Sequence, residues 1–218
     1  MPRGAATLAR TAPGPESLVG LFAERVRSLG GRVWLAPGGR EEVRRTLLTA
    51  IDELVPAEAK QGSPRMVAWT VDELEPLDLA GLLRGAGIGY VPWRREAGET
   101  EDAARARLRA ASAAGAVGLT TCAWAAAETG TVALYAAPAS GRLVSLLPGA
   151  HLALVRPTQL VLGIPEGLEL LARGAGTSGG LPATVSLVSG PSRSADIEGD
   201  ISIGVHGPAR LGVVVGDW

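Results

Sequence analysis

The strongest constraint on the fold is a repeated alternation of short apolar runs with amphipathic helical segments over the first 120 residues. Apolar runs bounded by turn residues predict strands, and apolar residues spaced three and four apart predict helices. Strands separated by helices pair in parallel, because a parallel pair needs a long crossover. We therefore expect an α/β fold with a mainly parallel sheet and helices on both faces. The expected strands are 33–36, 66–69, 88–91 and 116–120, and the expected helices are 17–29, 41–54, 77–84 and 101–114.

The rhythm changes after Gly130, where apolar runs follow one another too closely for helical crossovers. Such spacing predicts hairpins or a meander added to the sheet. We expect strands over 131–135, 143–147 and 152–155, a helix over 159–171, a loop over 174–182, and final strands over 185–188 and 211–215.

The chain of 218 residues has the length of one domain with a sizeable core. Residues 1–16 are rich in Ala, Pro and Gly, which predicts a loose N-terminal lead-in before a single domain over 17–218. Ser17 is the expected N-cap of the first helix. Thr70 and Glu73 have the spacing of a capping box before the helix over 77–84.

Charge and cysteine content exclude several classes of protein. The net charge is −1 and the Arg residues are scattered, so nothing predicts a partner that is nucleic acid. Neither a signal-peptide core nor a charge-free apolar run of membrane length is visible, so we expect no membrane insertion and a cytoplasmic location. Cys122 is the one cysteine, which excludes an internal disulfide, an iron–sulfur cluster and a structural zinc in this chain.

The first candidate site runs from Leu119 to Thr131. A predicted strand ends at Thr120–Thr121, and ligands of parallel sheets bind at that end of a strand. A small-residue turn or helix then leads to Glu128, a carboxylate in an apolar neighbourhood that would serve as nucleophile or base. Equally, Glu128 would cap a helix or bind backbone N–H groups at the turn with Thr129 and Gly130. Cys122 is expected to be a small buried hydrophobe.

The second candidate site is the run from Val188 to Glu198, which concentrates Gly, Pro, hydroxyls, carboxylates and an Arg between two strands. Ser192–Ser194 would open a short helix, and the N-terminus of a helix favours an anion. Arg193 would add a bidentate contact. The alternative is a capped turn with an Arg193–Asp196 salt bridge and no ligand. The predicted ligand contacts of this run are Ser189, Gly190, Ser192, Arg193, Ser194 and Asp196, together with Gly207. Those of the first site are Thr120, Thr121, Thr129 and Gly130.

The two histidines receive different predictions. His206 lies in Gly204-Val-His-Gly-Pro208 and would act as a general acid or base, with Asp196 or Glu198 as its orienting partner. The alternative is a histidine that bonds a turn carbonyl. His151 follows Pro148-Gly149 and is expected to be structural. His151 and His206 lie far apart in the sequence and do not have the spacing of metal ligands, so we expect no metal site.

These motifs resemble the lactate utilization protein C family, whose module is called the LUD domain. The motifs that carry the resemblance are Ala127-Glu-Thr-Gly-Thr131, Leu146-Leu-Pro-x-x-His151, Ser189-Gly-Pro-Ser-Arg-Ser-Ala-Asp-Ile-Glu198 and Gly204-Val-His-Gly-Pro208, and they span about the last hundred residues. Ser194 stands where the family commonly has Thr, which keeps the hydroxyl.

The resemblance implies a three-layer α/β/α sandwich like that of the sugar-phosphate isomerase and CoA-transferase superfamily (the NagB/RpiA/CoA-transferase-like fold). It also implies a role in oxidising L-lactate to pyruvate beside two partner subunits that bear iron–sulfur clusters. The single cysteine of this chain agrees with clusters held by the partners. We expect such a component to bind a small anionic ligand.

Two other functions stay open at this point. Glu128-Thr-Gly resembles the Glu-x-Gly turn that carries the nucleophilic glutamate of related CoA-transferases, which implies a stand-alone acyl-transfer, CoA-transfer or sugar-phosphate enzyme. The third possibility is a regulatory or assembly subunit without chemistry, whose motifs are structural turns.

Overall fold

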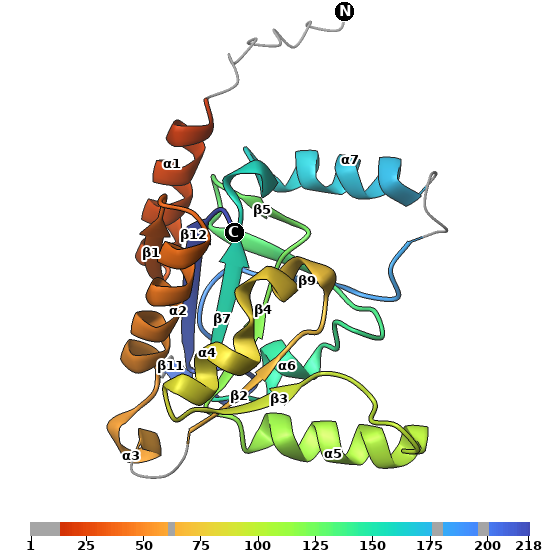
Figure 1. The fold of residues 1–218 in the computed structure, drawn as a ribbon. Helices are drawn as coiled ribbons and strands as arrows, with labels where there is room; N and C mark the ends of the chain where they lie inside the picture. Colours follow the sequence, from red (N-terminus) through yellow and green to blue (C-terminus); the bar gives the residue numbers. More distant parts are fainter. Residues whose placement is uncertain (1–13, 61–63, 176–180, 196–200) are drawn as a thin grey trace, which may run out of the picture.

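The protein is built on a six-stranded sheet in which every neighbouring pair is parallel (Figure 1). The computed structural model describes residues 14–60, 64–175, 181–195 and 201–218. The prediction of an α/β fold with a mainly parallel sheet is confirmed. In spatial order the strands are β1 (Arg32–Ala36), β12 (Arg210–Gly216), β7 (Ala150–Val155), β4 (Val117–Thr120), β2 (Arg65–Ala68) and β3 (Gly89–Pro92).

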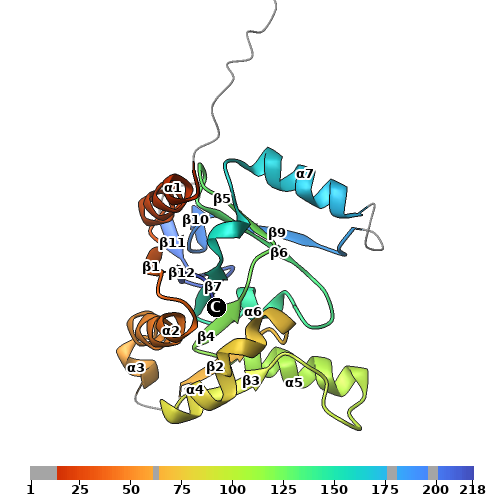
Figure 2. The ribbon, with the colours of Figure 1, turned by 45° about the horizontal axis from the view of Figure 1, so that its top comes forward.

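Helices cover both faces of this sheet and complete the three layers (Figures 1 and 2). The step from β2 to β3 and the step from β3 to β4 run in opposite directions across the sheet, so right-handed crossovers place α4 and α5 on opposite faces. The helices are α1 (Pro15–Ser28), α2 (Arg40–Leu54), the single turn α3 (Ala57–Lys60), α4 (Leu79–Gly85), α5 (Glu101–Ala113) and α6 (Leu143–Leu146).

A second sheet stands beside the first, in the order β8-β5-β6-β9. Its strands are β8 (Leu160–Val161), β5 (Trp124–Ala126), β6 (Thr131–Tyr135) and β9 (Val185–Val188), and α7 (Ile164–Ala175) packs on it. A separate two-stranded ribbon joins β10 (Arg193–Ala195) to β11 (Ile201–Ile203). Within the described ranges, no helix combines the length and the apolar character that crossing a bilayer requires.

Three predictions after Gly130 are wrong. The run 143–147 is the helical turn α6, not a strand, and it presses on β4 so closely that a Cβ on Gly118 would collide with the Val144 carbonyl. The run 152–155 belongs to the parallel sheet as β7, not to a meander. The predicted helix over 159–171 is a 3₁₀ turn (Pro157–Gln159), then β8, and only then α7. Short apolar runs do not by themselves distinguish helix from strand.

Two predicted helix starts are also wrong. α1 begins at Pro15, because proline suits the first position of a helix, and Ser17 lies inside it. The Thr70 hydroxyl donates to the Trp93 carbonyl at 2.8 Å and caps no helix. The segment after it is a 3₁₀ helix, η1 (Asp72–Leu77), and α4 is capped instead by Asp78, whose side chain accepts from the Gly81 N–H.

His151 lies in the centre of the core and is 1% exposed. Its Nε2 is 2.9 Å from the Thr120 hydroxyl oxygen, while its Nδ1 has no hydrogen-bond partner within the described residues. Desolvation lowers the pKa of this imidazole to about 4, because the buried site disfavours the charged ring. His151 is therefore a neutral core residue of β7 that contacts Thr120 of the neighbouring β4, in agreement with its predicted structural role.

We expect His151 to make the fold acid-sensitive. The unfolded chain takes up a proton near pH 6.5 and the folded chain only near pH 4, so stability falls as pH drops between these values. At about 1.4 kcal/mol per pKa unit, the loss reaches about 3 kcal/mol. Urea unfolding from pH 7 to pH 4 measures it, and in His151→Gln that part of the slope should vanish. An identical slope in the variant would contradict this assignment.

Candidate functional site

The exits of neighbouring strands diverge around β2. After β2 the chain continues through η1 and α4 on one face of the sheet. After β3 it continues through α5 on the other face, and after β4 it runs toward the second sheet. Crevices that receive ligands form at the carboxyl ends of parallel strands where successive connections leave on opposite faces. The structure has a cavity on each side of the β2 exit, and both cavities share Trp69, Thr70 and Val71.

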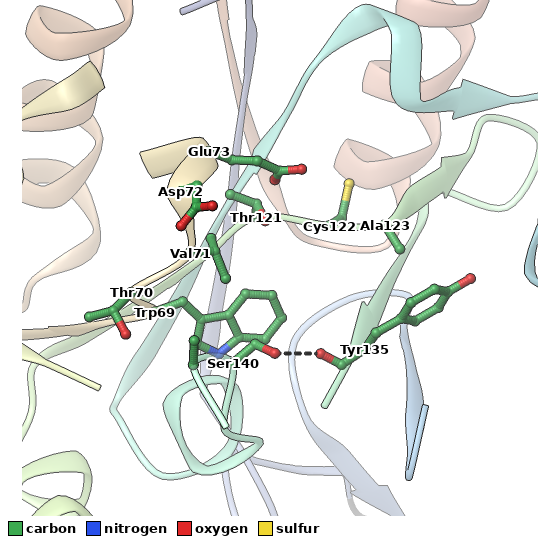
Figure 3. Close-up of a pocket in the computed structure, with 11 residues that line it drawn as sticks. Trp69, Thr70, Val71, Asp72, Glu73, Thr121, Cys122, Ala123, Tyr135 and Ser140 are labelled. Carbon is green, nitrogen blue, oxygen red and sulfur yellow. Dashed lines mark hydrogen bonds between the residues drawn. The ribbon is translucent and has the colours of Figure 1, made fainter. Parts of the chain in front are cut away.

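The first cavity lies between the exits of β2 and β4 and has a volume of about 420 Å³ (Figure 3). The chain after β2 lines one side, and the chain after β4 lines the other. Its residues are Trp69, Thr70, Val71, Asp72, Glu73, Thr121, Cys122, Ala123, Tyr135, Ala139 and Ser140.

The second cavity lies between the exits of β2 and β3 and has a volume of about 450 Å³. Tyr90, Pro92 and Arg94 contribute the β3 side. Asp78, which lines the opposite side, is the one described residue other than glycine with a positive φ, at 44°. Its strain is explained by its cap on α4, so the conformation itself does not indicate a ligand.

Thr121 and Cys122 form the deep part of the first cavity. Thr121 is 4% exposed, and its hydroxyl makes no hydrogen bond to any part of the chain that the structure describes. The Cys122 thiol donates to the Gln159 Oε1 at 3.7 Å. Burial raises the pKa of this thiol, the nearby Glu73 carboxylate raises it further and Arg156 opposes the shift. Cys122 is thus a protonated, buried side chain, as predicted.

Asp72 and Glu73 form an exposed carboxylate rim above these groups (Figure 3). The Trp218 indole N–H donates to the Glu73 carbonyl, and the Arg156 guanidinium stacks 4.1 Å from the centroid of that indole. Arg156 in turn donates its backbone N–H to Gln159. The rim is therefore tied to the sheet through a chain of polar contacts.

The same chain of contacts reaches the deep part of the cavity. Gln159 accepts the Arg156 N–H at 2.8 Å and donates its amide to the Cys122 carbonyl at 2.6 Å. Rim and floor are thus positioned by one connected set of side chains. Among the residues that line the first cavity, the described side chains offer carboxylates and hydroxyls and no Arg or Lys.

The residues predicted for the first site lie in different places in the structure, and only some of them line the first cavity. Thr120 is buried against His151, while Thr121 faces the cavity. The segment before Glu128 is strand β5, which we did not expect. Glu128 is half-buried in the turn between β5 and β6, and its N–H donates to the Leu162 carbonyl at 2.9 Å.

The turn at Thr129 and Gly130 packs against α1. Gly130 has a φ of 60°, and a Cβ there would lie 2.8 Å from the Val26 nitrogen. The Thr129 hydroxyl is 2.7 Å from the Thr131 hydroxyl, which is 2.8 Å from the Ser189 hydroxyl. The two predicted sites therefore meet in a hydroxyl chain, and this junction lines neither cavity described above.

The predicted short helix at Ser192–Ser194 is wrong. Residues 193–195 form β10, in which Ser194 pairs with Ser202 of β11, so no helix N-terminus is present there to bind an anion. Arg193 donates from Nη2 to the Leu29 carbonyl at 2.7 Å and so closes the end of α1. Cross-strand pairing depends on a partner strand that a local pattern does not reveal.

The remaining predicted residues gather at the amino edge of the main sheet. The Ser192 N–H donates to the Pro208 carbonyl at 2.9 Å, and a Cβ on Gly207 would lie 3.2 Å from the Ser192 Cβ. Gly190 has a φ of 137° and lies against Leu29. His206 is exposed. Its predicted partners Asp196 and Glu198, and with them the Arg193–Asp196 pair, lie outside the described residues.

The fold and the two cavities described above define an α/β protein with candidate ligand sites at the carboxyl edge of a parallel sheet. The model of the LUD domain matches residues 19–215, and the chain belongs to this family. A crystal structure of a DUF162 family protein from Deinococcus radiodurans has the same fold, with a TM-score of 0.63 at 23% identity over 94% of this chain and 99% of that chain.

Curated relatives are named lactate utilization protein C. The one from Shouchella clausii is 32% identical over 171 residues, 78% of this chain and 69% of the relative. The one from Halalkalibacterium halodurans is 29% identical over 80% of this chain and 72% of the relative. Lactate utilization protein C 1 from Bacillus mycoides is 42% identical over 91 residues, 42% of this chain and 39% of the relative.

We expect Gly130→Ala to destabilise the fold far more than Gly87→Ala. Both glycines have a positive φ, 60° and 71°, but a Cβ meets the α1 backbone at Gly130 and nothing within 4 Å at Gly87. Strain alone costs about 1 kcal/mol, and strain with overpacking about 3 kcal/mol. Chemical denaturation of both variants measures the difference. Equal losses would show that the turn does not press on α1.

Proposed function

We propose that the protein is the C component of a system for L-lactate utilization, in which L-lactate is oxidised to pyruvate with partner subunits that bear iron–sulfur clusters. The observation that carries the proposal is membership of the LUD domain family together with relatives named lactate utilization protein C. The role of the partners follows from the resemblance in the motifs described above.

The chemistry of the chain's own thiol supports a role without electron transfer. Cys122 is its one cysteine, and this side chain is buried, protonated and bonded to Gln159. An iron–sulfur cluster needs several thiolates, so any cluster of the system would be held by another subunit. The contribution of this chain would then be to bind a ligand, to position a partner or to transfer a group.

A small anionic ligand stays part of the proposal, with Arg193 as its cation. Arg193 is exposed and uses Nη2 for the Leu29 carbonyl. It lies in the segment that follows Ser189, whose hydroxyl joins the chain to Thr131 and Thr129. An anion at this junction would be bound by a guanidinium and hydroxyls in place of the helix N-terminus that we first expected.

Growth on L-lactate tests the proposed function. Deleting the gene in its own organism should abolish growth on L-lactate and leave growth on pyruvate normal, because only the oxidation step is lost. The intact gene supplied from a plasmid should restore growth. Normal growth of the deletion strain on L-lactate would reject the proposal.

Affinity purification of the tagged full chain from lactate-grown cells tests the partners. We expect proteins that contain iron and acid-labile sulfide to co-purify. Restored growth without such partners would leave the role in lactate utilization in place and reject the proposed assembly.

A second candidate is an acyl or CoA transferase that uses Glu128. The observation in its favour is a half-buried carboxylate on a turn that Gly130 fixes against α1. Incubation with an acyl-CoA, followed by borohydride or hydroxylamine trapping and mass spectrometry, would then locate an adduct on Glu128. Glu128→Gln serves as the control. Absence of an adduct on the wild-type chain over a panel of acyl-CoA esters would remove this candidate.

A further inference from the structure

We propose that the first cavity binds the ribosyl group of a nucleoside or nucleotide, whose vicinal hydroxyls donate hydrogen bonds to Asp72 and Glu73. This inference goes beyond the proposed function, which assigns no ligand to the carboxyl edge. It combines the position of the cavity, the charge of its rim, an unpaired hydroxyl in its depth and an aromatic wall.

The charge of the rim selects a ligand that donates hydrogen bonds. Asp72 and Glu73 face the cavity, and no described Arg or Lys lines it. A free carboxylate or phosphate would meet two like charges at the rim, and Arg156, whose charge reaches Cys122, is stacked on Trp218 and does not line the cavity, which disfavours binding of an anion. Hydroxyl groups suit the same rim, because each ionised carboxylate only accepts hydrogen bonds. L-Lactate and pyruvate are thus poor ligands for this cavity.

The Thr121 hydroxyl offers an unpaired polar group to a ligand in the deep part of the cavity. Thr121 is 4% exposed, and its hydroxyl has no hydrogen-bond partner among the described residues. Its oxygen is not among the enclosed unpaired side-chain atoms of the described residues, which are Ser112 Oγ and His151 Nδ1, so it is open to the cavity. A ligand atom with both donor and acceptor capacity, such as a sugar hydroxyl or ring nitrogen, would pair this hydroxyl.

One wall of the cavity is apolar, with the edge of the largely buried Trp69 indole at its centre. The Trp69 indole is held in place by its N–H, which donates to the Gly141 carbonyl at 3.0 Å. Val71, Ala123 and Ala139 add apolar surface around it. Aromatic and aliphatic walls with a few polar groups are typical of small-molecule sites, and about 420 Å³ lies within their usual range.

The position of the carboxylates matches the chemistry of ribose recognition. In dinucleotide-binding α/β folds an acidic side chain near the carboxyl ends of the strands accepts a hydrogen bond from a ribose hydroxyl, and Asp72 and Glu73 occupy a comparable place here. Here Glu73 is held at its own carbonyl by Trp218, and Trp218 is stacked on Arg156. The backbone of the rim is therefore fixed before a ligand arrives, which lowers part of the entropy cost of binding.

Calorimetric titration of the full chain with adenosine, guanosine, cytidine and uridine tests the proposal. We expect saturable binding of at least one ribonucleoside, and binding at least tenfold weaker for its 2′,3′-dideoxy analogue, which lacks both donors. The corresponding 5′-monophosphate distinguishes a nucleoside site from a nucleotide site: tighter binding assigns a nucleotide, and weaker binding assigns a free nucleoside.

Variants locate the site. Asp72→Ala and Glu73→Ala should each weaken ribonucleoside binding about tenfold or more and leave the dideoxy analogue unaffected, because that analogue makes no use of the carboxylates. Glu75→Ala is the matched control, since Glu75 is exposed on the same η1 but lines the second cavity. Melting temperatures confirm folding, and Asp72→Asn and Glu73→Gln replace any alanine variant that fails to fold.

Three results would overturn the proposal: no binding of any ribonucleoside, equal binding of the dideoxy analogue, or equal effects of Glu75→Ala and the two rim variants. Saturable binding of L-lactate that depends on Asp72 or Glu73 would overturn it as well. The growth test of the proposed function is independent, so each of the two ideas can fail while the other stands.

Discussion

The structure depends on the parallel pairing of β12 with both β1 and β7. This last strand inserts between β1, the first strand of the chain, and β7, which lies in sequence between β6 and β8 of the second sheet. Val213, Val214 and Val215 bury their side chains there. Because parallel neighbours must come from distant parts of the sequence, the pairing joins the two ends of the chain into one core. The segments before and after β12 make contacts at the amino and carboxyl ends of the strands of the main sheet.

The segments at the two ends of β12 serve different regions. Before β12, residues 204–208 hold Ser192 and bring the Ser189 segment to the end of α1, where Arg193 and Gly130 complete the junction. After β12, Trp218 crosses to Glu73 at the rim of the first cavity. The described part of the family's motifs thus builds the amino edge and its junction with α1, whereas both cavities lie at the carboxyl edge.

The spacing of apolar residues predicted the parallel sheet, because the strand and the helix of each unit differ in the period at which their apolar residues recur. The same reasoning predicted a strand at 143–147 and a helix at Ser192–Ser194, where packing on β4 and pairing with β11 decide the outcome. Thr121 was found from the rule about strand ends, and it does line a cavity. Asp72 and Glu73, which line the same cavity, were not singled out, since Glu73 has the capping-box spacing from Thr70 and Asp72 lies inside that motif. Only the strand order reveals that β2 lies between two strands with diverging exits.

The solitary thiol on the cavity floor has a practical value that concerns no ligand at all. Cys122 is the chain's one cysteine, and although it lines the cavity its side chain is buried, so a reagent in the cavity reaches the sulfur only when the surrounding chain moves. The rate at which a thiol reagent modifies the native protein therefore reports how often this edge of the sheet opens, without an engineered probe. A comparison of that rate with the rate of global unfolding distinguishes local opening of the cavity from unfolding of the whole core.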